Sequence, residues 1–177
     1  MTIPVPDVIT AKILLDGTIE QIRFAREYTL SLLDETPQDC WFEFPAGLPT
    51  NIAWQVGHLT VSQYGLLMFR LRGRRPEDLE LIPGPFRKKY NRKTTPKTDP
   101  SNQPSADELQ QRLTQVFDMS LKELPQTDPE VLLEAVDRPW AGWPNKLGAI
   151  MFCPLHEHIH AGQIGVLRRA LGLEPIR

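Results

Sequence analysis

Apolar residues recur at helical spacing in four stretches of the sequence, with polar residues between them. The stretches run from about Asp7 to Asp34, Thr50 to Arg72, Ser105 to Leu124 and Asn145 to Leu171. Each stretch predicts a helix with one buried face. Thr50 is a suitable cap for the second helix, and Ser105 with Glu108 has the pattern of a capping box for the third.

The segments between these helices show no sustained alternation of apolar and polar residues, so little or no sheet is expected. Val131 to Arg138 fits either a short strand or a helical turn. The link from about Gly73 to Pro104 is long enough to return along a whole helix, because a 20-residue helix spans about 30 Å. The sequence therefore predicts an all-α domain over residues 1–177, a four-helix bundle with a long crossover between its second and third helices.

Composition narrows the class of protein. The 177 residues are 41% hydrophobic and 24% charged, as in a soluble globular protein. The net charge of −2 argues against a nucleic-acid binder, and no apolar run is long enough to cross a membrane. Met1 to Asp16 lacks the pattern of a signal peptide, and Cys40 and Cys153 are too few and too far apart to suggest a disulfide framework. A cytoplasmic protein is expected.

Histidine is scarce and concentrated in this sequence. Three of the four histidines lie between His156 and His160. On a helix these two are one turn apart, about 40° around the axis, so both imidazoles can reach one atom, whereas His158 points elsewhere. His58, on the second predicted helix, supplies a third nitrogen. Three protein ligands with an open fourth position are typical of a catalytic metal site.

A single histidine is more often an ordinary buried or surface side chain than a ligand, so the pair at His156 and His160 is what favours a metal. The expected cofactor is a divalent ion, zinc or nickel ahead of iron or manganese, although imidazoles do not select strongly among such ions.

Residues 156–160 also fit the H-E-x-x-H motif of zinc proteases, in which Glu157 would be the general base. The longer protease motif fails because Gln163 and Val166 stand where it needs glycine and histidine. Glu174 is the sole carboxylate after the motif that could complete a ligand set. A protease is therefore disfavoured, and Glu157 is instead the candidate for a proton-handling catalytic residue.

Two motifs carry a family resemblance. Gly57-His58-Leu59, together with His156-x-x-x-His160-x-Gly162-Gln163-Ile164, resembles the DinB superfamily, which includes the YfiT-like metal-dependent hydrolases. The order of the expected elements agrees over nearly the whole chain. The resemblance implies a four-helix bundle in which His58, His156 and His160 bind a divalent metal. Members with an activity are mostly transferases or isomerases that use low-molecular-weight thiols, so the resemblance implies a site more firmly than a reaction.

Several neighbours of the histidines leave alternatives open. Cys153 is a fourth ligand, a reactive thiol or a small buried residue, and the last is the commonest fate of a free cysteine. Pro154 either kinks the last helix or begins a new one. Gly57 and Gly162 would let the helix backbones approach closely enough for the imidazoles to converge. Gln163 is a candidate partner for the second nitrogen of a ligand.

Two further features concern the surroundings of the site. Trp54 lies one turn before His58 and is expected to wall the pocket. The long link is rich in cations, which fit a solvated loop or, alternatively, an anion or cofactor clamp at the mouth of the site. These cations are Arg87, Lys88, Lys89, Arg92, Lys93 and Lys97.

Together these features predict an enzyme in which the metal activates a water or a small thiol that attacks a small electrophilic substrate. Transferase is preferred to hydrolase only through the resemblance. The alternative is a non-catalytic metal-binding or stress-response protein, a homodimer through the outer faces of the bundle. An open coordination position favours the enzyme, and a site closed by Cys153 favours the alternative.

Overall fold

The computed structural model describes residues 3–45 and 47–176. Its helices are α1 (Val8–Asp34), α2 (Ile52–Tyr64), α3 (Arg70–Arg72), α4 (Asp78–Leu81), α5 (Gly84–Lys89), α6 (Ala106–Glu123), α7 (Pro129–Leu133) and α8 (Lys146–Ala170). A π-helical turn, η2 (Gly65–Phe69), joins α2 to α3, and 3-10 turns occur at Gln38–Cys40, Pro100–Asn102 and Leu124–Gln126. The strands are β1 (Ala135–Trp140) and β2 (Trp143–Asn145). The predicted all-α class is confirmed.

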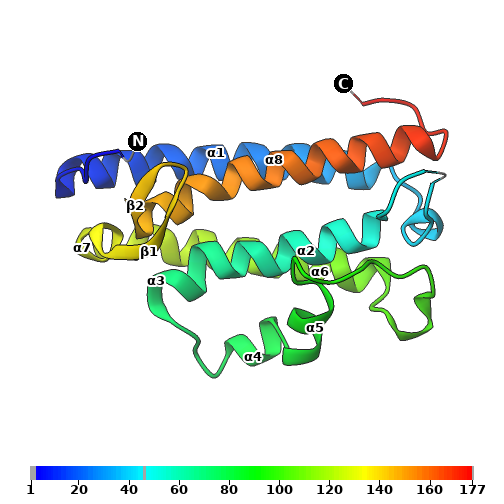
Figure 1. Cartoon of the computed structure of the whole chain (residues 1–177), viewed down its shortest axis with the longest axis horizontal. Coiled ribbons are helices and arrows are strands. Elements are labelled where there is room, and N and C mark those ends of the chain that lie inside the picture. The colour runs from blue at the N-terminus through cyan, green and yellow to red at the C-terminus, as the bar shows by residue number, and fades with distance from the viewer. Residues whose placement is uncertain (1–2, 46, 177) are drawn as a thin grey trace.

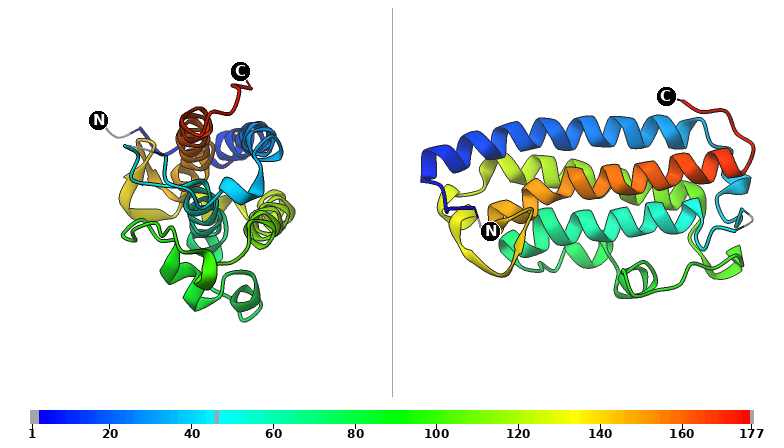
Figure 2. Two further views of the ribbon diagram at one scale, coloured as in Figure 1. Left: turned by 90° about the vertical axis from the view of Figure 1, so that its right-hand side faces the viewer. Right: turned by 45° about the horizontal axis from the view of Figure 1, so that its top comes forward.

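The long helices lie parallel or antiparallel to one another. Figure 1 shows α1 and α8 side by side and running in the same direction, with α2 and α6 running the opposite way. Seen end-on in Figure 2, these four helices surround a common axis. The link from α3 returns along the outside of α2, carrying α4 and α5, and starts α6 at the far end of the bundle (Figure 1). The predicted long crossover is confirmed.

Local sequence explains where the helices begin. Ser105 caps α6 by accepting a hydrogen bond from the Glu108 backbone N–H, and the Glu108 carboxylate accepts one from the Ser105 N–H, as a capping box requires. Asn51 caps α2, so the prediction of Thr50 was wrong by one residue. The Thr50 hydroxyl instead accepts a hydrogen bond from the Gln55 side chain.

A small hairpin follows α7, where the sequence predicted only a short strand or a helical turn. Its strands pair antiparallel, joined by Ala141 and Gly142 with φ of 48° and 85°, the positive values that a tight hairpin turn needs. The alternatives for residues 131–138 both occur in part, because α7 ends at Leu133 and β1 begins at Ala135. The hairpin packs on the first turn of α8, where a Cβ on Gly148 would lie 2.5 Å from the Trp140 carbonyl oxygen.

The last helix is continuous through Pro154, so no new helix begins there. The alternative of a second helix start is wrong. Among the described residues, no helix is both long enough and apolar enough to span a membrane.

Arg26 joins the long helices at the centre of the bundle. Its guanidinium, on α1, donates to the Glu157 carboxylate of α8 at 2.7 Å, the Gln63 side-chain oxygen of α2 at 2.7 Å and the Leu113 carbonyl of α6 at 2.9 Å. Arg26 and Glu157 are each only 2% exposed. This network fixes how the four helices are rotated relative to one another.

Candidate metal centre

The imidazoles of His58, His156 and His160 meet between α2 and α8. One ring nitrogen of each lies within 4.8 Å of the others. Nε2 of His156 is 3.2 Å from Nε2 of His160. Zinc–nitrogen bonds of about 2.0–2.1 Å in a tetrahedral site place the ligand nitrogens roughly 3.3 Å apart. The three histidines that the sequence singled out are therefore brought together at a spacing that fits a metal ion.

Hydrogen bonds from the outside fix the tautomers of two of these rings. Nδ1 of His58 donates to the Tyr90 carbonyl oxygen at 2.8 Å, and Nδ1 of His160 donates to Oε1 of Gln55 at 2.5 Å. Both partners are oxygens that only accept, so the proton resides on Nδ1 and the Nε2 lone pair is free. Metal-bound imidazoles are usually held in this way.

Neither partner was singled out from the sequence. Tyr90 lies in the crossover, and nothing local links it to His58. Gln55 is one turn before His58 on α2, but the ring that it orients is that of His160, 105 residues away. The Gln163 side chain, the predicted partner, also hydrogen-bonds His160, and this bond only partly offsets the lowering of the His160 pKa by burial and by the other two imidazoles.

Burial keeps the three histidines neutral. For His156, burial and then the neighbouring His58 lower the pKa to about 4. For His160, burial and then the other two imidazoles lower the pKa to about 3. Burial also lowers the pKa of His58, despite its hydrogen bond to Tyr90. A neutral imidazole is the form that binds a metal, so no proton has to be displaced near pH 7.

Aromatic side chains wall the cluster on two sides. The Trp54 ring stacks on His58 with 4.8 Å between centroids and 4° between planes, which confirms the expected wall. On the other side, Phe152 packs on His156 at 5.7 Å and Trp140 packs on Phe152 at 5.3 Å. The hairpin thus completes the surroundings of the site.

Ser62 places a hydroxyl beside the ligand nitrogens. Its Oγ is 3.3 Å from Nε2 of His58, one helical turn away on α2. This residue was not predicted, although its spacing of four from His58 puts both on one helix face. Ser62 is therefore a polar group within reach of whatever the histidines hold.

Glu157 lies outside the histidine cluster. Both of its carboxylate oxygens accept hydrogen bonds from Arg26, at 2.7 and 3.3 Å, inside the bundle. The group of potential ligands found among the described residues contains the three histidines without Glu157. Its proton-handling role stays a prediction.

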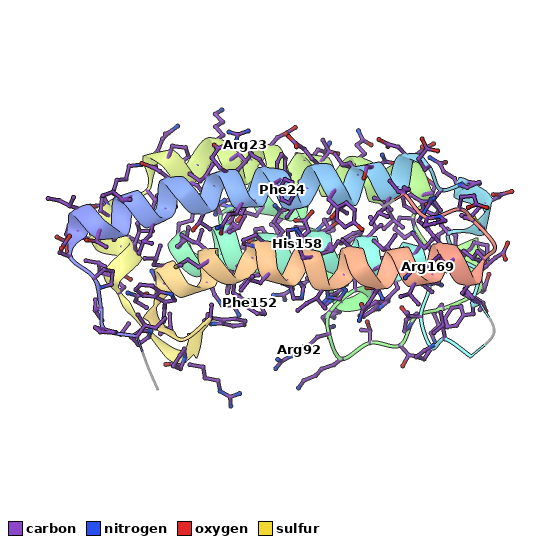
Figure 3. All side chains as sticks on the ribbon, turned by 90° about the horizontal axis from the view of Figure 1, so that it is seen from above. Arg23, Phe24, Arg92, Phe152, His158 and Arg169 are labelled. Carbon is purple, nitrogen blue, oxygen red and sulfur yellow. The ribbon has the colours of Figure 1, made fainter. Side chains whose placement is uncertain are left out.

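Cys153 and His158 also lie apart from the cluster. Cys153 is 2% exposed, and burial, with Glu157 nearby, raises the pKa of its thiol. It therefore matches the buried core residue rather than the ligand or the reactive thiol. His158 packs against Phe24 and stacks on Tyr28 of α1, and Figure 3 shows it between α1 and α8.

The two glycines near the ligands differ. A Cβ on Gly57 would lie 2.4–2.7 Å from atoms of the Tyr90 ring, so the close approach is made by a side chain and not by a helix backbone. A Cβ on Gly162 would meet nothing within 4 Å. The expectation of close helix backbones is thus wrong for Gly162, and for Gly57 the partner differs.

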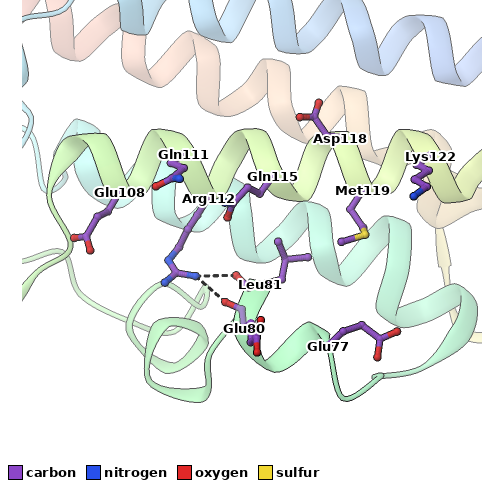
Figure 4. A pocket seen from close by; sticks show the side chains of 10 residues that line it. All are labelled: Glu77, Glu80, Leu81, Glu108, Gln111, Arg112, Gln115, Asp118, Met119 and Lys122. Atoms are coloured by element: carbon purple, nitrogen blue, oxygen red, sulfur yellow. Dashed lines mark hydrogen bonds between the residues drawn. The ribbon is translucent and has the colours of Figure 1, made fainter.

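A broad groove of about 740 Å³ lies elsewhere, between α4 and α6 (Figure 4). None of the three histidines lines it, and Arg112 bridges it by donating to the carbonyl oxygens of Glu80 and Leu81. Its lining residues are Glu77, Glu80, Leu81, Glu108, Gln111, Arg112, Gln115, Asp118, Met119 and Lys122.

Comparison with known families agrees with the geometry. Residues 21–164 match the sequence model of the DinB superfamily, a span that includes all three histidines. The chain belongs to the DinB superfamily. No curated protein matches the sequence. DinB-like proteins bind metals, and in this member His58, His156 and His160 are near enough to one another to hold one.

Proposed function

We propose that this DinB superfamily member is a metal-dependent enzyme in which His58, His156 and His160 hold a divalent ion. When bound, that ion would supply Lewis-acid activation of a water or a low-molecular-weight thiol toward a small electrophilic substrate. The observation that carries the proposal is the convergence of three ring nitrogens within 4.8 Å, with the tautomers of two rings fixed by outer hydrogen bonds.

The protein's own side chains have separate tasks in this proposal. Tyr90 and Gln55 orient the ligand rings, and Trp54 and Phe152 exclude bulk water from two sides. The Ser62 hydroxyl, 3.3 Å from Nε2 of His58, is placed to hydrogen-bond the incoming nucleophile. No cysteine enters the cluster among the described residues, so the protein supplies three ligands, the number typical of a catalytic site.

Transfer to or from a thiol is preferred to hydrolysis because of the family resemblance. A test of the reaction would incubate the metal-loaded protein with alkyl halides and epoxides, with and without small thiols, and follow loss of free thiol. Turnover that needs both thiol and metal supports a transferase, whereas turnover without thiol supports a hydrolase.

The metal site itself is tested by elemental analysis of protein purified without a histidine tag or chelator. We expect about one zinc or nickel per chain, lost in the double variant His58→Ala, His160→Ala. His158→Ala is the matched control, because this histidine lies outside the cluster on the same helix. Metal retained by the double variant would contradict the site. Bound metal without turnover on any electrophile would favour the non-catalytic alternative.

A further inference from the structure

A cation without an acidic partner is connected to the candidate metal centre through a series of aromatic rings. Arg70 is half-buried, and its guanidinium stacks on Trp140 at 4.6 Å. Trp140 packs on Phe152, which in turn packs on His156. None of the ion pairs among the described residues involves Arg70 or Arg92. An arginine removed from water without a carboxylate is an unfavourable arrangement unless something else supplies the negative charge.

The π-helical turn explains how Arg70 reaches this position. In η2 the Arg70 N–H donates to the Gly65 carbonyl oxygen five residues back, so the backbone of Arg70 lies one π-helical turn beyond Gly65. The side chain then folds back, and its NH1 donates to the same carbonyl oxygen at 2.8 Å. Gly65 is less than one turn after Ser62, the hydroxyl that reaches Nε2 of His58. Arg70 is therefore connected to the histidine cluster in two ways, along α2 through Gly65 and Ser62 and through the rings of Trp140 and Phe152.

A second arginine and open space accompany it. Arg92 is close enough that its charge, after burial, lowers the pKa of Arg70, and it lies on the same side of α8 as Phe152 (Figure 3). A hollow of about 370 Å³ beside Gly65 is lined by two further cations, Arg87 and Lys88 of α5, although neither Arg70 nor Arg92 nor a ligand histidine lines it. Like charges gathered around a hollow raise the local concentration of anions.

We infer that Arg70 and Arg92 form a clamp for an acidic group, a carboxylate or phosphate, on the molecule that binds at the open side of the three histidines. The planar guanidinium of Arg70 suits such an oxyanion, and its stacking on Trp140 holds it in place. This inference rests on the proposed function, since it names the charge of the ligand that the same site takes.

The test is a charge series of small thiols added to the cobalt-loaded protein, followed by the absorption of the cobalt ion. The probes are 3-mercaptopropionate, 2-mercaptoethanol and cysteamine, which are similar in size and carry negative, no and positive charge. We expect mercaptopropionate to bind about tenfold or more tightly than mercaptoethanol, as one charge-assisted hydrogen bond would provide. Added salt should reduce this preference.

Substitutions of the two arginines test whether the preference for mercaptopropionate comes from the clamp. Arg70→Met should remove most of it while leaving the affinity for mercaptoethanol within about twofold, and Arg70→Lys should restore part. Arg92 is exposed, so Arg92→Gln tests the clamp without disturbing folding. Arg23→Met is the matched control, because Arg23 lies on the outer side of α1 (Figure 3). Equal affinities across the series, or a preference that survives both clamp variants, would overturn the inference.

A measurement on the metal-free protein separates failure of the clamp from failure of the metal site. Sodium propionate, titrated into the metal-free protein, should shift the indole N–H resonance of Trp140, and Arg70→Met should abolish the shift. If cobalt does not bind the histidines, the proposed function fails, while the propionate shift still supports the clamp. Absence of the shift counts against the clamp whatever the metal result.

Discussion

At the scale of single residues, the orientation of His58 depends on the glycine that precedes it, Gly57. The Tyr90 ring occupies the space where a side chain on Gly57 would lie, and this packing brings the Tyr90 carbonyl oxygen to 2.8 Å from Nδ1 of His58. The glycine is thus needed for a hydrogen bond made by its neighbour.

We therefore expect Gly57→Ala to weaken metal binding about 10–100-fold, the usual cost of losing the hydrogen bond that holds a metal-bound imidazole. The measurement is competition for zinc against a chelator of known affinity. Gly162→Ala is the control, since its Cβ meets nothing within 4 Å. It should leave metal affinity unchanged and stabilise the helix by about 1 kcal/mol. Equal loss of affinity in both variants would show that helix propensity, not the Tyr90 contact, is responsible.

The ligands could be predicted from the sequence, but the groups that orient them could not. His156 and His160 are joined by helical spacing, and His58, on another predicted helix, completes the set, as the family resemblance also implies. Tyr90 acts through its backbone carbonyl, which any residue possesses, so its identity carries no signal. Gln55 acts across 105 residues of sequence on His160, a distance at which only packing decides the partner.

At the scale of helices, the buried pair of Arg26 and Glu157 sets the rotation of α8 against α1. Glu157 lies between His156 and His160 in the same helical turn, so any rotation of α8 would move both imidazoles. Arg26 also donates to α2 and α6 and stacks on Phe117 at 4.8 Å. The pair is thus a structural centre of the bundle.

Glu157→Gln should destabilise the protein by about 3–5 kcal/mol, because it leaves the Arg26 charge buried without its partner. Replacing both residues by Met should recover at least about 2 kcal/mol of that loss, since no unpaired charge remains. Urea unfolding of the single and double variants measures both effects. A stable Glu157→Gln variant that loses only turnover would instead support the proton-handling role.

The helices were predictable because their apolar spacing and caps are local signals, as at Ser105 and Glu108. The π-helical turn and the hairpin were not. Gly65–Phe69 retains an apolar helical pattern, and the extra residue in the turn becomes visible only in its hydrogen bonds. β2 has three residues, too few to establish an alternation.

At the scale of the whole molecule, Asp78 fastens the long crossover to the bundle. Its carboxylate accepts two hydrogen bonds from Arg72, both 2.9 Å, and one from the Tyr64 hydroxyl, also 2.9 Å. Arg72 in turn contacts Glu123 of α6. Burial opposes the charge of Asp78, but these hydrogen bonds, with one from the Arg75 N–H, lower its pKa to about 2.

The pKa of Asp78 is lower in the folded protein than in the unfolded chain, where it is about 3.9. Its charge therefore contributes about 2 kcal/mol of stability above pH 4, which is lost as the pH falls toward 2. Asp78→Asn should be less stable than the wild type at pH 6, and the gap in unfolding free energy should narrow by about that amount near pH 2. Asp118→Asn, at an exposed position on α6, should show no such narrowing. A difference in unfolding free energy between Asp78→Asn and the wild type that does not change with pH would contradict the lowered pKa of Asp78.

A divalent ion on three histidines would join α2 to α8, so binding should stabilise the whole fold. At a free concentration 100 times its dissociation constant, an ion that binds only the folded state adds about 2.7 kcal/mol, which raises the melting temperature of a protein of this size by about 5–10 °C.

Acid should destabilise the metal-free protein before it destabilises the metal-bound protein. His156 and His160 have pKa values of about 4 and 3 in the folded state. Near pH 6.5 the unfolded chain therefore binds protons that these two imidazoles do not bind in the folded protein. The free energy of unfolding consequently falls as the pH drops below about 6.5.

The same low pKa values predict that protons do not compete with the metal until well below pH 6.5. The rise in melting temperature with zinc or nickel should therefore persist at pH 5.5, where a pair of exposed histidines would already be protonated and would release the ion. Differential scanning calorimetry at pH 7.5 and 5.5, with and without the ion, measures this directly. His158→Ala should behave as the wild type, because this ring packs against Phe24 outside the cluster. A rise that survives in the His58→Ala, His160→Ala variant would place the metal elsewhere on the molecule.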